Sequence, residues 1–115
     1  MDMEKATMQL IVNSGDARSK AMEAIESAKA GNFDDADQKI QSADEALSNA
    51  HESQASIIQA EAAGEIKRMT LLMAHAQDHL MCAIAILDVA KEFIALYRKI
   101  QPSGSEKTGG NNSND

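Results

Sequence analysis

A His-Ala-Gln-Asp-His run beginning at His75 holds the residues of this chain best suited to chemistry. On a helix, His75, Asp78 and His79 fall at positions i, i+3 and i+4, and Cys82 follows at i+7, so all four share one face. They interrupt the most apolar stretch of the sequence, residues 71–97. Polar groups are costly to bury there without partners. Because histidine suits proton, metal or phosphoryl chemistry near neutral pH, we expect any chemistry of this protein at this run.

Three chemistries fit these residue types. The first is a zinc site, because histidines at i and i+4 can chelate one ion, with a third ligand from His51 or a carboxylate of the preceding helix. The second is general acid–base catalysis by a His–Asp pair, although the sequence offers few loops to build a substrate pocket. The third is a histidine that accepts a phosphoryl group and passes it on, which requires only an accessible imidazole and a docking surface. A non-catalytic helical oligomer with a structural metal or a buried His–Asp network is the alternative to all three.

The residues around this run predict long helices. The chain is rich in Ala and contains only one Pro, a composition that favours helix. Gly31 and Gly64 are the expected C-terminal caps. The predicted helices run from about Met3 to Ala30, from the capping residue Asn32 or Asp34 to about Ala63, and from about Ile66 to Ile100. Short connections make neighbouring helices antiparallel, so the expected fold is all-α, an antiparallel three-helix up-down-up bundle.

Apolar spacing predicts which faces meet in the bundle. Small residues at Gly15, Ala17, Ala21, Ala43 and Ala50 would let the long helices approach closely. The third helix is apolar over most of its circumference, more than two neighbours can cover, so we expect a homo-oligomer with this helix at its centre. The predicted core stripes are Met8, Ile11, Gly15, Met22 and Ile25 on the first helix, and Ala36, Ile40, Ala43, Leu47, Ala50 and Ile57 on the second.

Length and charge limit the class of protein. The 115 residues suit one domain at 1–101, and residues 102–115 hold nothing apolar to pack and are expected to form a disordered tail. A net charge of −7 argues against nucleic acid as a partner and favours basic partners. A lone cysteine and a non-basic start predict a cytoplasmic protein. The apolar stretch 69–90 is long enough to span a membrane but contains several polar residues, so no membrane insertion is expected.

The sequence resembles a known family, the lactose/cellobiose-type IIA components of the phosphoenolpyruvate-dependent sugar phosphotransferase system. The string Leu-Leu-Met-Ala-His-Ala-Gln-Asp-His-Leu-Met at 71–81 is similar to the signature of that family. Residues 11–19, Ile-Val-Asn-Ser-Gly-Asp-Ala-Arg-Ser, resemble its first-helix motif. Residues 28–33 and 46–51 resemble its first turn and second helix, and the likeness extends over residues 4–100. Ala74 and Cys82 depart from the residues common in the family.

The resemblance implies a homotrimer of three-helix subunits that relays a phosphoryl group. His75 would accept it from the phosphocarrier protein HPr and donate it to a cysteine of the cognate IIB, during uptake of β-glucoside or lactose-type sugars. Asp78 would lie at the three-fold axis, where three copies hold one Mg²⁺ per trimer, and Gln77 and His79 would have supporting roles. Three carboxylates in an apolar seam repel unless neutralised, and oxygen ligands favour a hard cation. Cellobiose, chitobiose and lactose all remain open as the sugar.

Overall fold

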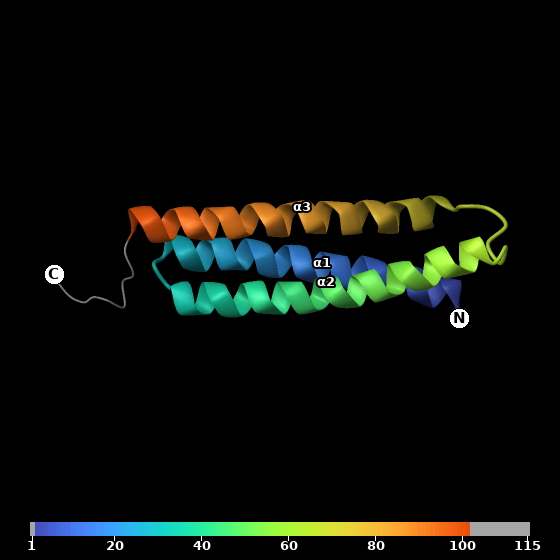
Figure 1. The fold of residues 1–115 in the computed structure, drawn as a ribbon, viewed down its shortest axis with the longest axis horizontal. Helices are drawn as coiled ribbons and strands as arrows, with labels where there is room; N and C mark the ends of the chain where they lie inside the picture. The colour runs from blue at the N-terminus through green and yellow to red at the C-terminus, as the bar shows by residue number, and fades with distance from the viewer. Residues whose placement is uncertain (1, 102–115) are drawn as a thin grey trace.

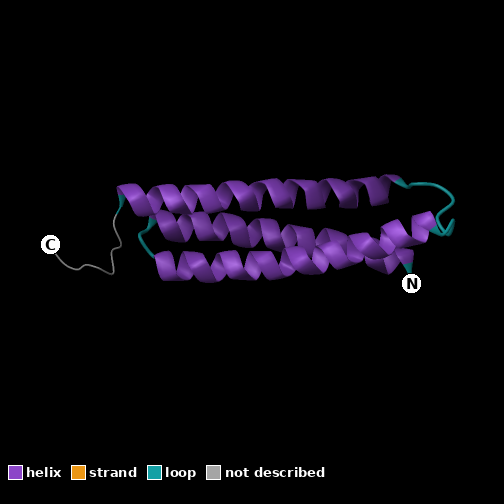
Figure 2. Cartoon of the chain, viewed as in Figure 1, coloured by secondary structure: helices purple, strands orange, loops and turns teal. Residues whose placement is uncertain are grey.

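The chain forms three long α-helices in a computed structural model, which describes residues 2–101 (Figures 1 and 2). They are α1 (Met3–Lys29), α2 (Phe33–Ala62) and α3 (Leu71–Ile100), and the described residues contain no strand. Each helix is about 40 to 45 Å long at 1.5 Å per residue. α1 and α3 run in the same direction and α2 runs against both, so the predicted up-down-up bundle is confirmed (Figure 1). The predicted tail at 102–115 lies outside the described residues.

Glycine ends both of the first two helices, as the sequence predicts. Gly31 has φ +83° and Gly64 has φ +77°, a conformation that costs glycine little. After α1, the Gly31 amide donates to the Ala28 carbonyl and the Asn32 amide to the Ser27 carbonyl, and the same pair of bonds follows α2. This is the Schellman arrangement, and it turns the chain sharply at the last helical residue.

α3 begins later than the sequence predicts. Instead of starting at about Ile66, it starts at Leu71, and residues 63–70 form an irregular connection. Thr70 fixes the boundary, because its side chain accepts a hydrogen bond from the Met73 amide at 3.0 Å. Such a cap satisfies a backbone donor that the first turn leaves unpaired.

The core is built mainly from alanine, and this corrects the predicted stripe on the first helix. α1 buries Ala6, Leu10, Ser14, Ala17, Ala21, Ala24 and Ala28. Met8 and Met22, both placed in the predicted stripe, are exposed, whereas Ile11 and Ile25 of the same stripe are partly buried and pack against the core. Small side chains allow the helix backbones to approach closely. The alanine face of α1 therefore packs against the other helices, and the face with the larger Met8 and Met22 is left in solvent. The predicted stripe on α2 is confirmed: Ala36, Ala43, Ala50 and Ile57 are buried, and Ile40 and Leu47 pack against them.

Gly15 does not have the close-packing role that we predicted for it. A Cβ built at this position would meet nothing within 4 Å, whereas Ala17, Ala21, Ala43 and Ala50 are fully buried. The alanines therefore set the spacing of the helices. α1 packs extensively on both neighbours, while α2 and α3 contact each other much less.

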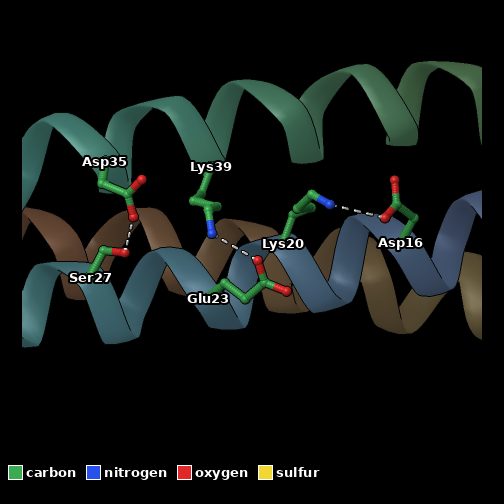
Figure 3. Close-up of polar contacts among 6 residues, drawn as sticks. All are labelled: Asp16, Lys20, Glu23, Ser27, Asp35 and Lys39. Atoms are coloured by element: carbon green, nitrogen blue, oxygen red, sulfur yellow. Dashed lines mark hydrogen bonds and ion pairs between the residues drawn. The ribbon is translucent and has the colours of Figure 1, made fainter.

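Polar contacts along the surface connect α1 to α2 (Figure 3). Lys39 of α2 donates to Glu23 of α1 at 3.0 Å, and Ser27 of α1 donates to Asp35 of α2. The hydrogen bond and charge of Lys39 lower the pKa of Glu23, and Glu23 in turn raises the pKa of Lys39. The Lys39–Glu23 pair is solvated, so it contributes little to stability.

Candidate functional site

His75 and His79 meet on the second and third turns of α3. Their Nε2 atoms lie 3.1 Å apart, and the rings stand edge to face with centroids 4.5 Å apart. One Nε2 donates and the other accepts, with the direction set by the tautomers. The i, i+4 spacing on a helix produces this pairing, as the sequence predicts. His75 is exposed and His79 is half-buried, so solvent and partner proteins can reach the pair.

An open hollow of about 440 Å³ lies beside His75. All the residues that line it belong to α3, so within one chain it has no opposite wall. This makes it a poor site for a small substrate, which needs burial on several sides, and a better surface for another macromolecule. The lining residues are Leu71, Leu72, Ala74, His75 and Asp78.

Gln77 turns away from the histidine pair. Its Oε1 accepts a hydrogen bond from Nε2 of Gln54 on α2 at 2.9 Å. The bond connects the last third of α2 to the second turn of α3, so Gln77 helps to hold the start of α3 in place. Sequence reasoning missed Gln54, since a single glutamine on a polar helix face gives no signal of its partner.

Asp78 is exposed on α3 and faces the same hollow as His75. Among residues 2–101, no group of three or more His, Cys, Asp or Glu side chains could hold a metal ion. The third zinc ligand considered from the sequence, His51 or a carboxylate of α2, is therefore not brought to the histidines within one chain. A metal at Asp78 would need carboxylates from other chains, and that expectation stays a prediction.

An exposed stripe extends along the whole outer face of α3, and we call it the α3 seam. Its residues recur at spacings of three and four, the pattern by which helices meet in a coiled coil. Apolar side chains dominate, and a second, smaller hollow near Phe93 lies on it. Exposed apolar stripes of this length mark interfaces. The seam comprises Leu71, His75, Asp78, Cys82, Ala85, Val89, Phe93, Leu96 and Ile100, all exposed.

The position of His75 near the start of α3 suits a group that gains negative charge. Helical side chains lean toward the N-terminus, where the helix dipole is positive and stabilises an anion. The first turn of α3 contains no acidic residue, whereas those of α1 and α2 contain Glu4 and the pair Asp34 and Asp35. A phosphoryl group on His75 would therefore meet no carboxylate in that turn.

No helix within residues 2–101 has the length and apolar character to cross a bilayer.

Comparison with protein families identifies the chain. Residues 5–98 match the family described as PTS system, Lactose/Cellobiose specific IIA subunit. The chain is 52% identical over 99 residues to the lichenan-specific phosphotransferase enzyme IIA component of Bacillus subtilis, covering 86% of this chain and 90% of that protein. It is 41% identical over 91 residues to the lactose-specific EIIA component of Staphylococcus epidermidis, covering 79% and 88% of the two chains.

Solved structures give the same assignment. The crystal structure of the cellobiose-specific enzyme IIA from Bacillus anthracis matches with a TM-score of 0.82 at 46% identity, covering 95% of each chain. The chitobiose IIA in the solution structure of its complex with HPr from Escherichia coli matches with a TM-score of 0.76 at 36% identity, covering 88% of this chain and 98% of that one. The chain therefore belongs to the lactose/cellobiose-specific IIA family and is a phosphotransferase component of the sugar phosphotransferase system.

Proposed function

We propose that His75 is the residue that accepts the phosphoryl group from HPr and donates it to a cysteine of the cognate IIB. The imidazole nitrogen forms a bond to phosphorus as the bond to the donor breaks, and the reverse occurs when the cysteine sulfur attacks. The observation that carries this proposal is the exposure of His75 in an open hollow, paired with His79 at 3.1 Å. In the tautomer in which Nε2–H of His79 donates, Nε2 of His75 carries a lone pair, and this is the nitrogen that would attack phosphorus once the hydrogen bond opens.

HPr as the donor is supported by two independent features. A relative with 36% identity has been solved in complex with HPr. This chain also has a net charge of −7, which would speed encounter with a basic partner surface. Apolar side chains around His75, including the exposed Leu71 and Leu72, would supply the contact area.

We also propose that the subunits assemble as a homotrimer through the α3 seam. Parallel copies of α3 meeting along this stripe from Asp78 onward would bury Val89, Phe93 and Leu96, which are about half exposed in one chain, and would leave Leu71 and His75 accessible. The same assembly would bring three Asp78 carboxylates together in an apolar setting. The donor set fits Mg²⁺, which prefers oxygen ligands, and the cation would remove the repulsion among three negative charges. Asp78 would thus hold one ion per trimer.

The component is expected to act in the cytoplasm during uptake of β-glucoside or lactose-type sugars. The relatives named for lichenan, cellobiose, chitobiose and lactose all share its fold or sequence pattern. Since the IIA component does not touch the sugar, its own site residues do not select among them. Growth on each sugar after deletion of the gene would identify the one transported.

The test of the relay is reconstitution with enzyme I, HPr, phosphoenolpyruvate and Mg²⁺. Wild type should gain one acid-labile phosphoryl group per chain, and addition of IIB should remove it. His75→Gln should gain none. His51→Gln is the matched control, because His51 is an exposed histidine on α2 outside the hollow, and it should behave as wild type. Labelling of His75→Gln at the wild-type level would refute the assignment.

A further inference from the structure

We propose that His75 and His79 form a reversible zinc site whose occupation blocks the phosphoryl acceptor. The two Nε2 atoms lie 3.1 Å apart in a hydrogen bond, on rings that stand edge to face. Zinc–nitrogen bonds of about 2.0–2.1 Å in a tetrahedral centre place two ligand nitrogens about 3.4 Å apart. The nitrogen–nitrogen distance therefore needs to grow by only a few tenths of an ångström, together with a rotation of the rings that turns both lone pairs toward the ion.

The ligand chemistry selects the cation. Neutral imidazole nitrogens suit zinc and related transition metals, while Mg²⁺ prefers oxygen and keeps its waters. His79 is one residue from Asp78, so α3 would present a nitrogen site and an oxygen site side by side. Mg²⁺ at the carboxylate does not compete for the imidazoles, and zinc at the imidazoles leaves the carboxylate role unchanged.

Two protein ligands make the site exchangeable. Structural zinc sites use four protein ligands, and within residues 2–101 no third His, Cys, Asp or Glu side chain completes this one. Water would fill the remaining positions, since His75 is exposed. Binding requires both Nε2 lone pairs, so the proton held between the rings moves to the Nδ1 atom of the same imidazole. The net charge of the pair does not change before the ion arrives.

The consequence for phosphorylation rests on the proposed function of His75. Zinc on Nε2 uses the lone pair that would attack phosphorus, so metal binding and phosphorylation through this nitrogen exclude each other. The effect is reciprocal: a phosphoryl group on Nε2 removes one of the two zinc ligands, and phosphorylated protein loses the chelate.

The binding test uses zinc chloride with the full-length protein in saturating Mg²⁺, read by competition with a chromophoric zinc chelator. His75→Gln and His79→Gln should each weaken zinc binding about tenfold or more, and His51→Gln should leave it unchanged. Asp78→Asn should lose far less zinc affinity than His79→Gln. Equal zinc affinity in wild type and His79→Gln, or an equal loss in Asp78→Asn, would overturn the site.

A second measurement needs no variant. In wild type, zinc should shift the Nε2 resonances of His75 and His79 but not those of His51 in a ¹⁵N imidazole spectrum. The regulatory consequence is read separately, as zinc-dependent loss of phosphoryl transfer from HPr at constant Mg²⁺. Unchanged transfer at zinc concentrations that saturate the chelate would overturn the block. If His75 proves not to be the acceptor, the zinc titration still decides the site, so the two failures are distinguishable.

Discussion

The two ends of the bundle are built differently. At the closed end, where α1 turns into α2 and α3 ends, Arg98 lies over the Phe33 ring at 5.1 Å and donates to Asp37 at 2.6 Å. Gln101 donates to the Ala28 carbonyl at 2.8 Å and so caps α1 from a distant segment. The opposite end, called the acceptor end after the proposed role of His75, holds the 63–70 connection and the first turns of α3. The α3 seam leaves apolar side chains exposed at both ends, and the acceptor end adds the exposed Met69 and Leu72.

This difference places several polar cross-helix contacts at one end and the proposed acceptor at the other, while buried apolar clusters lie at both. The contacts of Arg98 and Gln101 at the closed end join all three helices. The acceptor end has the Gln54–Gln77 bond between α2 and α3 and an open hollow beside His75. HPr, IIB and neighbouring subunits are all proposed to bind near this end, and a surface that binds partners must stay exposed in the single chain.

The largest expected effect is loss of the closed-end anchor. Phe33 is 6% exposed and packs with Ala24, Ala28 and Ile94. Phe33→Ala should lower the free energy of unfolding by about 3–5 kcal/mol, since it removes a buried ring and leaves a cavity. Urea unfolding at fixed protein concentration measures this. At the acceptor end, Met69→Ala should change stability by no more than about 0.5 kcal/mol, because Met69 is exposed. Equal losses would remove the contrast between the ends.

Asp78→Leu, at the acceptor end, should raise stability rather than lower it. If three copies of this carboxylate meet in the α3 seam, the substitution removes their repulsion and should stabilise the oligomer by about 1–4 kcal/mol in the absence of metal. Magnesium binding should disappear. Thermal unfolding with and without Mg²⁺ measures both effects, and Asp88→Leu, an exposed aspartate of α3 outside the seam, is the control. Retained magnesium binding would exclude the shared site.

Each end of the bundle has a helix whose first turn is capped by a polar side chain, so removal of the two caps compares the ends through the same kind of interaction. Asn32 caps α2 at the closed end and Thr70 caps α3 at the acceptor end, each through a side-chain oxygen that accepts a backbone amide. Asn32→Ala and Thr70→Ala should each cost about 1 kcal/mol. Only Thr70→Ala should also raise amide exchange in the first turn of α3 and slow phosphorylation. An effect of Asn32→Ala on the phosphorylation rate would show that the ends are coupled.

Much of the fold could be predicted from the sequence because its composition, its helix caps and its short connections all indicate the same three-helix bundle. Alanine content favours helix, Gly31 and Gly64 mark two ends, and short turns impose antiparallel order. The start of α3 was predicted wrongly, because residues 66–70 contain no helix breaker and only the Thr70 cap ends the connection. The core face of α1 was predicted only in part: Ile11 and Ile25 pack against the core, but Met8 and Met22 do not. Hydrophobicity ranks Met8 above Ala6, but close packing of long helices selects the smaller side chain.

The site was predicted in part. Helical spacing alone brings His75 and His79 together, since i, i+4 partners meet on any helix. Gln77 was grouped with them by its position in the motif, yet its side chain pairs with Gln54, 23 residues away in sequence. Cross-helix partners depend on the register between helices, and a single sequence does not encode register in any local pattern.

The smallest expected effect tests one such cross-helix partner. Lys39 lowers the pKa of Glu23 through a hydrogen bond and its charge (Figure 3). A depressed carboxyl pKa contributes stability above the unfolded pKa, and this is lost as pH falls through the folded value. In Lys39→Met, the pKa of Glu23 measured by carboxyl NMR titration should rise toward the ordinary glutamate value, and added salt should produce part of the same rise in wild type. Lys29→Met, which removes a lysine paired with Glu26, should leave the Glu23 pKa where it is. If the pKa of Glu23 is unchanged in Lys39→Met but rises in Lys29→Met, the register between α1 and α2 differs from the one that the alanine core imposes.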